Sequence, residues 1–144
     1  MADGVFNIAK GAAAEKARDD ATKFGFILLK VVEADASLRD RTTITDVLAG
    51  STEANFTNYA RKTGVTATLT VDQTNDRVDL DIPDQTWTSA GGGTNNTLAK
   101  LIIYYEEAAA DASRVPITYH DFVVTTDGTD IIAQINASGF YRAS

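Results

Sequence analysis

Residues 66–88 read TATLTVDQTNDRVDLDIPDQTWT, and this stretch decides the fold because it contains two short strands that turn back on each other. On both sides of a polar centre, apolar and polar residues alternate, which is the side-chain period of a β-strand rather than of a helix. The centre, residues 73–76, has the Asn and Asp residues of a turn. Pro83 ends the second strand because proline has no N–H to donate. The pattern predicts a β-hairpin whose second strand exposes Asp79 and Asp81.

Outside the hairpin, runs of β-branched and aromatic residues separated by turn residues predict further strands. They cover residues 24–32, 56–62, 98–105, 115–124 and 131–135. The run at 24–32 has little alternation, which is typical of a buried strand at the centre of a core. Asp127 and Gly128 are typical of a tight turn, so the last two of these strands are expected to form a second hairpin.

Two other segments are expected to differ from the strands. Thr43 lies three residues before Asp46, which predicts a capped, short helix through Leu48 that Gly50 closes. Residues 89–96, SAGGGTNN, predict an exposed and mobile loop because Gly and Asn disfavour regular structure.

The N-terminal segment, residues 1–23, is predicted to be an arm or a marginal helix. Residues 9–21 are rich in alanine, so helical propensity is high, but the apolar side offers only methyl groups for packing. We therefore expect its order to depend on a neighbour. Residues 24–144 are expected to form a single β-rich domain. The whole pattern predicts a mainly β fold: an antiparallel β-sandwich or small barrel of six to seven strands with one short helix and an N-terminal arm.

Composition limits the function. A chain of 144 residues can bury a core of its own, and the absence of Cys excludes disulfides, thiolate catalysis and Cys-ligated zinc. The net charge of −7 leaves no basic stripe for a phosphate backbone, so neither nucleic acid nor an anionic membrane is an expected partner. The first residues show no basic segment followed by an apolar one, so no secretory signal is expected.

The sequence offers little reactive chemistry. His120 and Asp121 are adjacent in a predicted strand and point to opposite faces, so they do not form a base and its orienting partner. No nucleophile or phosphate-binding motif accompanies them. We expect no enzyme activity, no catalytic residue and no cofactor.

Five aspartates crowd the hairpin, namely Asp72, Asp76, Asp79, Asp81 and Asp84. Residues 72–76 imitate the opening of a calcium loop, but Arg77 stands where such a loop needs glycine. The other interpretation is a solvated acidic face or an edge strand protected by charge, which needs no metal. Like charges at Asp79 and Asp81 would then discourage pairing with another strand unless that strand brings Arg or Lys.

Six apolar residues are candidates for contact with a partner: Val5, Phe6, Ile8, Trp87, Tyr104 and Tyr105. Trp87 beside the glycine-rich loop is either an exposed platform or a core residue at the base of the loop. Tyr104 and Tyr105 point to opposite faces of one strand, so we expect one of them to face solvent or an interface.

Several segments resemble one family. They are VFNIAKG (5–11), LRDRTTITDVLAG (38–50), NFTNYARK (55–62), residues 70–106, PITYHDF (116–122) and ASGFYRAS (137–144). From residue 5 to 144 the chain resembles small virion-associated structural proteins encoded by tailed bacteriophages. The resemblance implies an accessory protein that decorates or cements the head, or a minor capsid protein. It also implies the major capsid protein lattice and copies of the chain itself as partners, and a place on the capsid surface after synthesis in the host cytoplasm.

Two alternatives remain open. One is a phage tail or baseplate component whose loop, residues 87–96, meets a receptor. The other is a cation-dependent carbohydrate-binding β-sandwich that uses Asp79, Asp81 and Trp87.

Overall fold

The computed structural model describes residues 3–144 and is mainly β, with antiparallel pairing between all of its strands. The strands are β1 (Gly4–Val5), β2 (Phe24–Val31), β3 (Thr52–Glu53), β4 (Lys62–Val65), β5 (Thr68–Asp72), β6 (Arg77–Asp81), β7 (Gln85–Trp87), β8 (Lys100–Glu106), β9 (Arg114–Asp121), β10 (Ile131–Ala133) and β11 (Tyr141–Ala143). The helices are α1 (Ala13–Asp19), α2 (Asp35–Leu38) and α3 (Ile44–Gly50), with 3-10 turns η1 (Asn7–Ala9) and η2 (Asp111–Ser113). The mainly β prediction is confirmed, although short added strands and helices exceed the expected counts.

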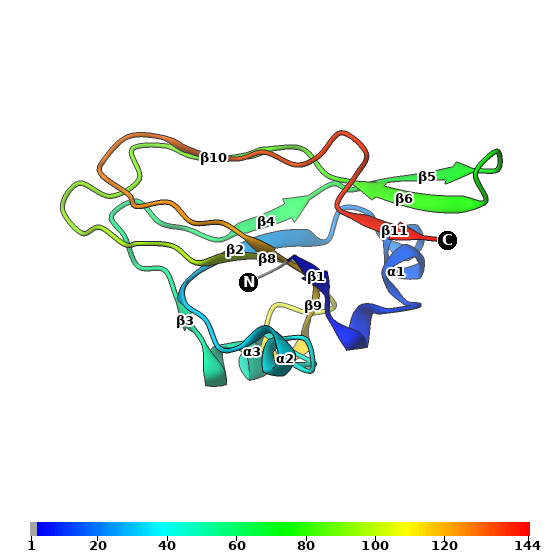
Figure 1. Ribbon diagram of the computed structural model, residues 1–144, viewed down its shortest axis with the longest axis horizontal. Helices are drawn as coiled ribbons and strands as arrows, with labels where there is room; N and C mark the ends of the chain where they lie inside the picture. The colour runs from blue at the N-terminus through cyan, green and yellow to red at the C-terminus, as the bar shows by residue number, and fades with distance from the viewer. Residues whose placement is uncertain (1–2) are drawn as a thin grey trace.

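A central sheet organises the molecule. Its strand order is β1-β9-β8-β2-β3, and β4 pairs with the same strand β2. In Figure 1, α2 and α3 lie on one side of this sheet, and the ribbons of β10, β5 and β6 lie on the other. Both faces of β2 and β8 are therefore covered, which gives a sandwich-like arrangement and explains why β2 shows no alternation in sequence.

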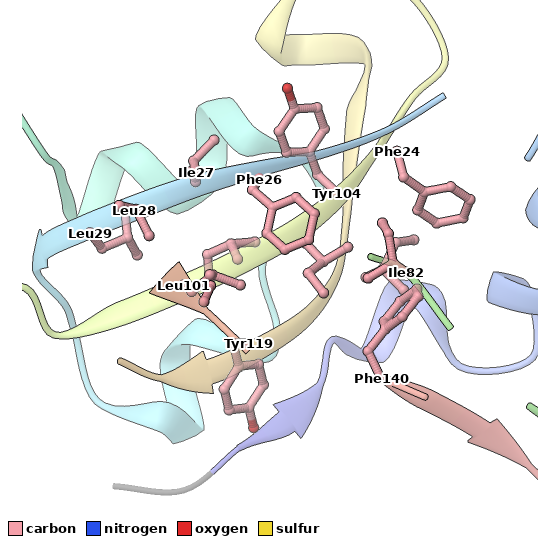
Figure 2. Packing of buried hydrophobic residues seen from close by; sticks show 14 of the residues in the cluster. Phe24, Phe26, Ile27, Leu28, Leu29, Ile82, Leu101, Tyr104, Tyr119 and Phe140 are labelled. Carbon is pink, nitrogen blue, oxygen red and sulfur yellow. The ribbon is translucent and has the colours of Figure 1, made fainter. Parts of the chain in front are cut away.

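Aromatic side chains fill one side of the central sheet. Phe24 of β2 lies edge-on to Tyr105, with 5.3 Å between ring centroids, and to Phe140, at 6.0 Å. Figure 2 shows Phe24, Ile82 and Phe140 close together at one end of this core. Because Phe140 directly precedes β11, the core on this side joins the central sheet to the C-terminal strand.

The N-terminal segment packs into the same core and is not a separate arm in this structure. Phe6 and Ala13 are fully buried, and Ala17 is 5% exposed. The phenylalanine ring lies edge-on to Tyr119, with 5.2 Å between centroids. Of the two sequence interpretations, the marginal helix agrees better, since α1 is a helix of seven residues. Because the buried side chains of α1 are the small ones of Ala13 and Ala17, the helix packs closely against β5 and β6.

The predicted strand at residues 56–62 is wrong, since regular pairing begins only at Lys62. Phe56 and Tyr59 are three residues apart and pack edge to face, with 5.2 Å between ring centroids. Asn58 between them has a φ of 69°, in the left-handed region. These two rings lie on one side of a turn, so their spacing does not reflect alternation along a strand.

The second predicted hairpin is also wrong. Ile131 and Ala133 of β10 pair with Trp87 and Gln85 of β7, not with β9. The Asp127 turn is present, because its carboxylate accepts a hydrogen bond from the Thr129 N–H at 3.0 Å. The turn directs the chain away from β9 and onto β7.

The glycine-rich loop is more tightly bonded than its composition suggests. Gly91 N–H donates to the Thr57 carbonyl at 2.9 Å, and Asn96 exchanges hydrogen bonds with Thr126. Ala90, Gly91 and Asn96 are buried, whereas Ser89 and residues 92–95 are exposed. The expectation of an exposed loop therefore holds for Ser89 and residues 92–95 but not for the rest of the segment.

The helix predicted after Thr43 is confirmed as α3. The Thr43 hydroxyl accepts a hydrogen bond from the Asp46 N–H at 3.1 Å, as the capping pattern requires. Gly50 is its last residue, and Ser51 is the C-cap. No helix in residues 3–144 is long and apolar enough to cross a membrane.

Candidate interaction surfaces

The predicted hairpin forms as β5 and β6, and β11 adds a third strand beside β6. We call β5, β6 and β11 together the hairpin sheet; Figure 1 shows β5 and β6 extending away from the central sheet. Its turn is closed by Asp72, whose carboxylate accepts hydrogen bonds from the Thr74 and Asn75 N–H groups at 3.1 and 3.2 Å. The Asn75 side-chain amide also donates to it and lowers the pKa of this carboxyl.

One face of the hairpin sheet is charged. Asp79 accepts from the Arg142 guanidinium of β11 at 2.6 Å and forms an ion pair with Arg77 at 3.1 Å. The carboxylates expected on the outside of the second strand thus attract a strand that brings arginine, and this strand is the chain's own β11. Because the Arg142 side chain is 43% exposed, its ion pair with Asp79 contributes little to stability.

The opposite face of the hairpin sheet is apolar. Leu69, Leu80 and Tyr141 lie in one cross-strand row, and Leu80 is fully buried. The next row toward the turn is Val71, Val78 and Ala143. A shallow hollow of about 400 Å³ borders this second row. Val71 is 52% exposed, so the apolar face continues beyond the part that the protein covers.

The free edge of β5 is the longest regular edge among the described strands. Its five residues pair with β6 without any register shift, and no strand within residues 3–144 pairs with its other side. It contains no Lys and no Pro, and its one charged residue is the terminal Asp72. Lysine, proline and charged side chains usually protect a strand edge from pairing with another chain, so the edge of β5 largely lacks this protection. The other edge strands have two to four residues.

The hairpin carboxylates do not converge. Asp84 accepts a hydrogen bond from the Ile135 N–H at 2.7 Å, and Asp81 accepts from the neighbouring Ile82 N–H at 2.8 Å. Asp72 and Asp79 are engaged as described above. Within residues 3–144, no group of three or more acidic or histidine side chains is placed to hold a metal ion.

Comparison of the chain with protein-family models, curated proteins and solved structures finds no match. Function is therefore inferred from the residues and their geometry.

Most of the apolar residues proposed as partner contacts lie in the interior. Phe6, Trp87, Tyr104 and Tyr105 are each at most 3% exposed. Val5 is half-buried, and Ile8 is 43% exposed. Of the six candidates, only Ile8 presents a large apolar surface.

The tyrosine pair was expected to have one exposed member, and this is wrong. Tyr104 and Tyr105 do point to opposite faces of β8, but both faces of the central sheet are covered. Tyr104 lies across from Gly25, where a Cβ would come within 2.5 Å of the Lys62 carbonyl oxygen. Burial raises the pKa of both phenols.

Trp87 is a core residue, in agreement with the second sequence interpretation. Its indole N–H donates to the Ala60 carbonyl at 2.8 Å, and Lys62 lies over its ring at 5.0 Å from the centroid. The residue offers no exposed aromatic platform beside the glycine-rich loop.

His120 lies against Asp3 instead of Asp121. Its Nδ1 is 3.4 Å from the Asp3 carboxylate, and its Nε2 is 2.9 Å from the Thr118 hydroxyl. The same Asp3 accepts from the Asp121 N–H at 2.6 Å. Burial lowers the pKa of His120, and the negative charge of Asp3 opposes this effect. A cavity of about 450 Å³ adjoins these residues, with Phe122 and Phe140 among those in its lining.

A buried lysine was not predicted from the sequence. Lys100 at the start of β8 is fully buried, and its ammonium group lies 2.5 Å from Asp121 and 3.3 Å from Asp35. It also lies 5.2 Å from the centroid of the Tyr119 ring. Lys100 stands between Leu98–Ala99 and LIIYY inside a predicted strand, but a lysine in such a run can equally extend its ammonium group to solvent, so the sequence did not indicate its burial.

A network around Arg61 was also not predicted. Its guanidinium donates to both carboxylate oxygens of Glu53 at 2.7 Å and to Asp111 at 2.6 and 3.1 Å. Arg114 donates to the same Asp111 at 2.7 Å, and Tyr59 donates to Glu53 at 2.8 Å. The hydrogen bonds to Glu53 and Asp111 raise the pKa of Arg61, and the hydrogen bond from Arg61 lowers the pKa of Asp111. The network joins β3, η2 and the chain before β4, so its carboxylates serve the fold.

Proposed function

We propose that this protein is a structural component of a tailed-phage virion, and specifically an accessory protein that decorates or cements the head. It acts through protein–protein contacts and not through catalysis. The resemblance of residues 5–144 to virion-associated proteins supports the proposal. So does the free edge of β5, which is regular, charged only at its terminal Asp72 and next to the exposed side chain of Val71.

The open edge fits attachment to a lattice of repeated subunits. A strand that adds to this edge gains main-chain hydrogen bonds along its length, while the neighbouring side chains determine which partner binds. Many copies that each contribute a modest interface can stabilise a shell strongly in sum. The proposed partners are therefore the major capsid protein lattice and copies of this chain, on the capsid surface.

The two alternatives receive less support from the geometry. A receptor-binding loop at residues 87–96 loses its aromatic anchor because Trp87 is buried. A cation-dependent carbohydrate site would use Asp79, Asp81 and Trp87, but Asp79 is paired with two arginines and Trp87 faces the core.

The test is mass spectrometry of purified virions of the encoding phage, with heads and tails separated. We expect the protein in the head fraction, at a copy number in fixed proportion to the major shell protein. Absence from purified particles would refute the proposal, and a few copies confined to tails would favour the tail component.

A further inference from the structure

We propose that two copies of this chain associate through their β5 strands, which pair antiparallel about a two-fold axis at Thr70. The inference deepens the proposed function by naming the partner of the open edge as a second copy. It rests on that function only in treating the hairpin sheet as an interface, since such a dimer forms whether or not a capsid is present.

The register follows from the side chains of β5. With the axis at Thr70, the two threonines face each other, Leu69 faces Val71 of the other copy, and Asp72 faces Thr68. No carboxylate meets a carboxylate across the junction, although the chain is acidic overall. An opposite-charge partner is not needed, because this edge is complementary to itself.

The same register keeps the two faces of the sheet continuous. Residues that pair across an antiparallel junction point to the same side, so the apolar row of one copy continues into the other. Val71, which is 52% exposed in the single chain, gains Leu69 of the second copy as its cross-strand neighbour. The two three-stranded hairpin sheets become one six-stranded sheet, β11-β6-β5-β5-β6-β11.

Other arrangements of this edge use shorter strands. Pairing of β5 with β11 of another copy joins five residues to three and leaves a free β5 and a free β11 at the ends. Such a head-to-tail contact grows into rings or filaments, whereas the two-fold contact stops at a dimer. The length of β5 and its self-complementarity favour the closed dimer.

The absence of Cys provides a direct test with the full chain. In the variant Thr70→Cys the two introduced thiols lie directly opposite each other, within the Cα separation that a disulfide requires. We expect a disulfide-linked dimer under mild oxidation. Thr86→Cys, at an exposed strand position of β7, is the matched control and is expected to remain largely unlinked.

Sedimentation of the unmodified chain and of Thr70→Lys completes the test. Thr70 is exposed, so lysine does not disturb the fold, but it places two like charges across the axis. We expect a dimer for the parent chain and a dissociation constant raised at least about tenfold for the variant. Circular dichroism checks that the variant is folded.

Three results would overturn the inference: a parent chain that stays monomeric at high micromolar concentration, cross-linking of Thr70→Cys no faster than the control, or concentration-dependent growth beyond a dimer. A monomer that is nevertheless found in virions would refute only the β5 pairing. A dimer that is absent from virions would refute only the capsid assignment.

Discussion

Lys100 is the residue whose burial demands most from its surroundings. A fully buried ammonium group is tolerated only when ionic partners and hydrogen bonds replace the water it has lost. Here Asp121 lies directly opposite Lys100 on the neighbouring strand β9, and Asp35 is the first residue of α2. The ion pair therefore links the central sheet to the helix that covers it.

Replacing Lys100 with methionine tests this link. Lys100→Met keeps most of the side-chain volume but removes the ammonium group from Asp121 and Asp35. Because both carboxylates are partly exposed and keep contact with water, we expect a loss of about 1.5 kcal/mol in the free energy of unfolding. Urea denaturation measures the change. Lys10→Met, at an exposed position, is the control and is expected to change stability by less than about 0.5 kcal/mol. A Lys100→Met variant as stable as the control would contradict the structural role of the pair.

The only histidine of the chain gives a pH prediction. Burial lowers the pKa of His120 below 6.5, so the unfolded state binds the proton more readily than the folded state does. The contribution of His120 to stability is therefore complete above pH 6.5 and is lost as the pH falls from 6.5 through the lowered folded pKa. NMR titration of the imidazole protons measures this pKa directly.

The Asp3 contact provides the matched variant for that titration. Because the Asp3 carboxylate favours the protonated imidazole, Asp3→Asn is expected to lower the pKa of His120 further. Glu15→Gln, at an exposed position of α1, is expected to leave it unchanged. A rise in the His120 pKa in Asp3→Asn would show that this contact does not form in solution.

At the scale of elements, Arg61 connects parts of the chain that the strands do not join. Its guanidinium binds Glu53 of β3 with two parallel hydrogen bonds and reaches Asp111 of η2 as well. The planar guanidinium group presents its N–H donors as a fork that matches the two carboxylate oxygens, and the ammonium group of a lysine cannot form the same pair of hydrogen bonds. The arginine thus fixes the position of η2 against the edge of the central sheet.

The conservative variant Arg61→Lys is predicted to be less stable by about 1 kcal/mol, because it keeps the charge but loses the paired hydrogen bonds. Thermal or urea unfolding measures the difference, with Arg18→Lys on the exposed side of α1 as the control. Equal stability of the two variants would mean that charge alone, and not the forked geometry, holds the network.

Elements whose information is local were predictable. The hairpin, the buried strand β2 and the capped helix α3 each follow from residues within a few positions of one another, and all three are present. The partner of β10 was not predictable in this way. A turn at Asp127 is compatible with a hairpin, but pairing with β7 depends on a segment about 45 residues earlier in the chain.

At the scale of the molecule, the sequence indicated the fold class but not how the layers cover each other. Tyr105 and Trp87 carry the same signals whether they face solvent or a second layer, so their burial became evident only with both faces of the central sheet covered. The candidate surface was partly predictable, because the acidic strand was expected to pair only with a strand that brings Arg or Lys, and β11 brings Arg142. The free edge of β5 was not, since it depends on which side of the hairpin β11 occupies.

The pairing of β1 with β9 has a kinetic consequence. Gly4 lies opposite Tyr119, and Phe24 lies opposite Tyr105, so the central sheet closes only when segments about 80 to 115 residues apart have met. Each such closure lowers the entropy of the chain before the contacts form that compensate for this loss. Folds dominated by pairings distant in sequence therefore reach their native structure in milliseconds to seconds. Until that search is complete, β2 and β8 are both unpaired strands in a nascent chain, which therefore has to fold before it meets other copies at high concentration.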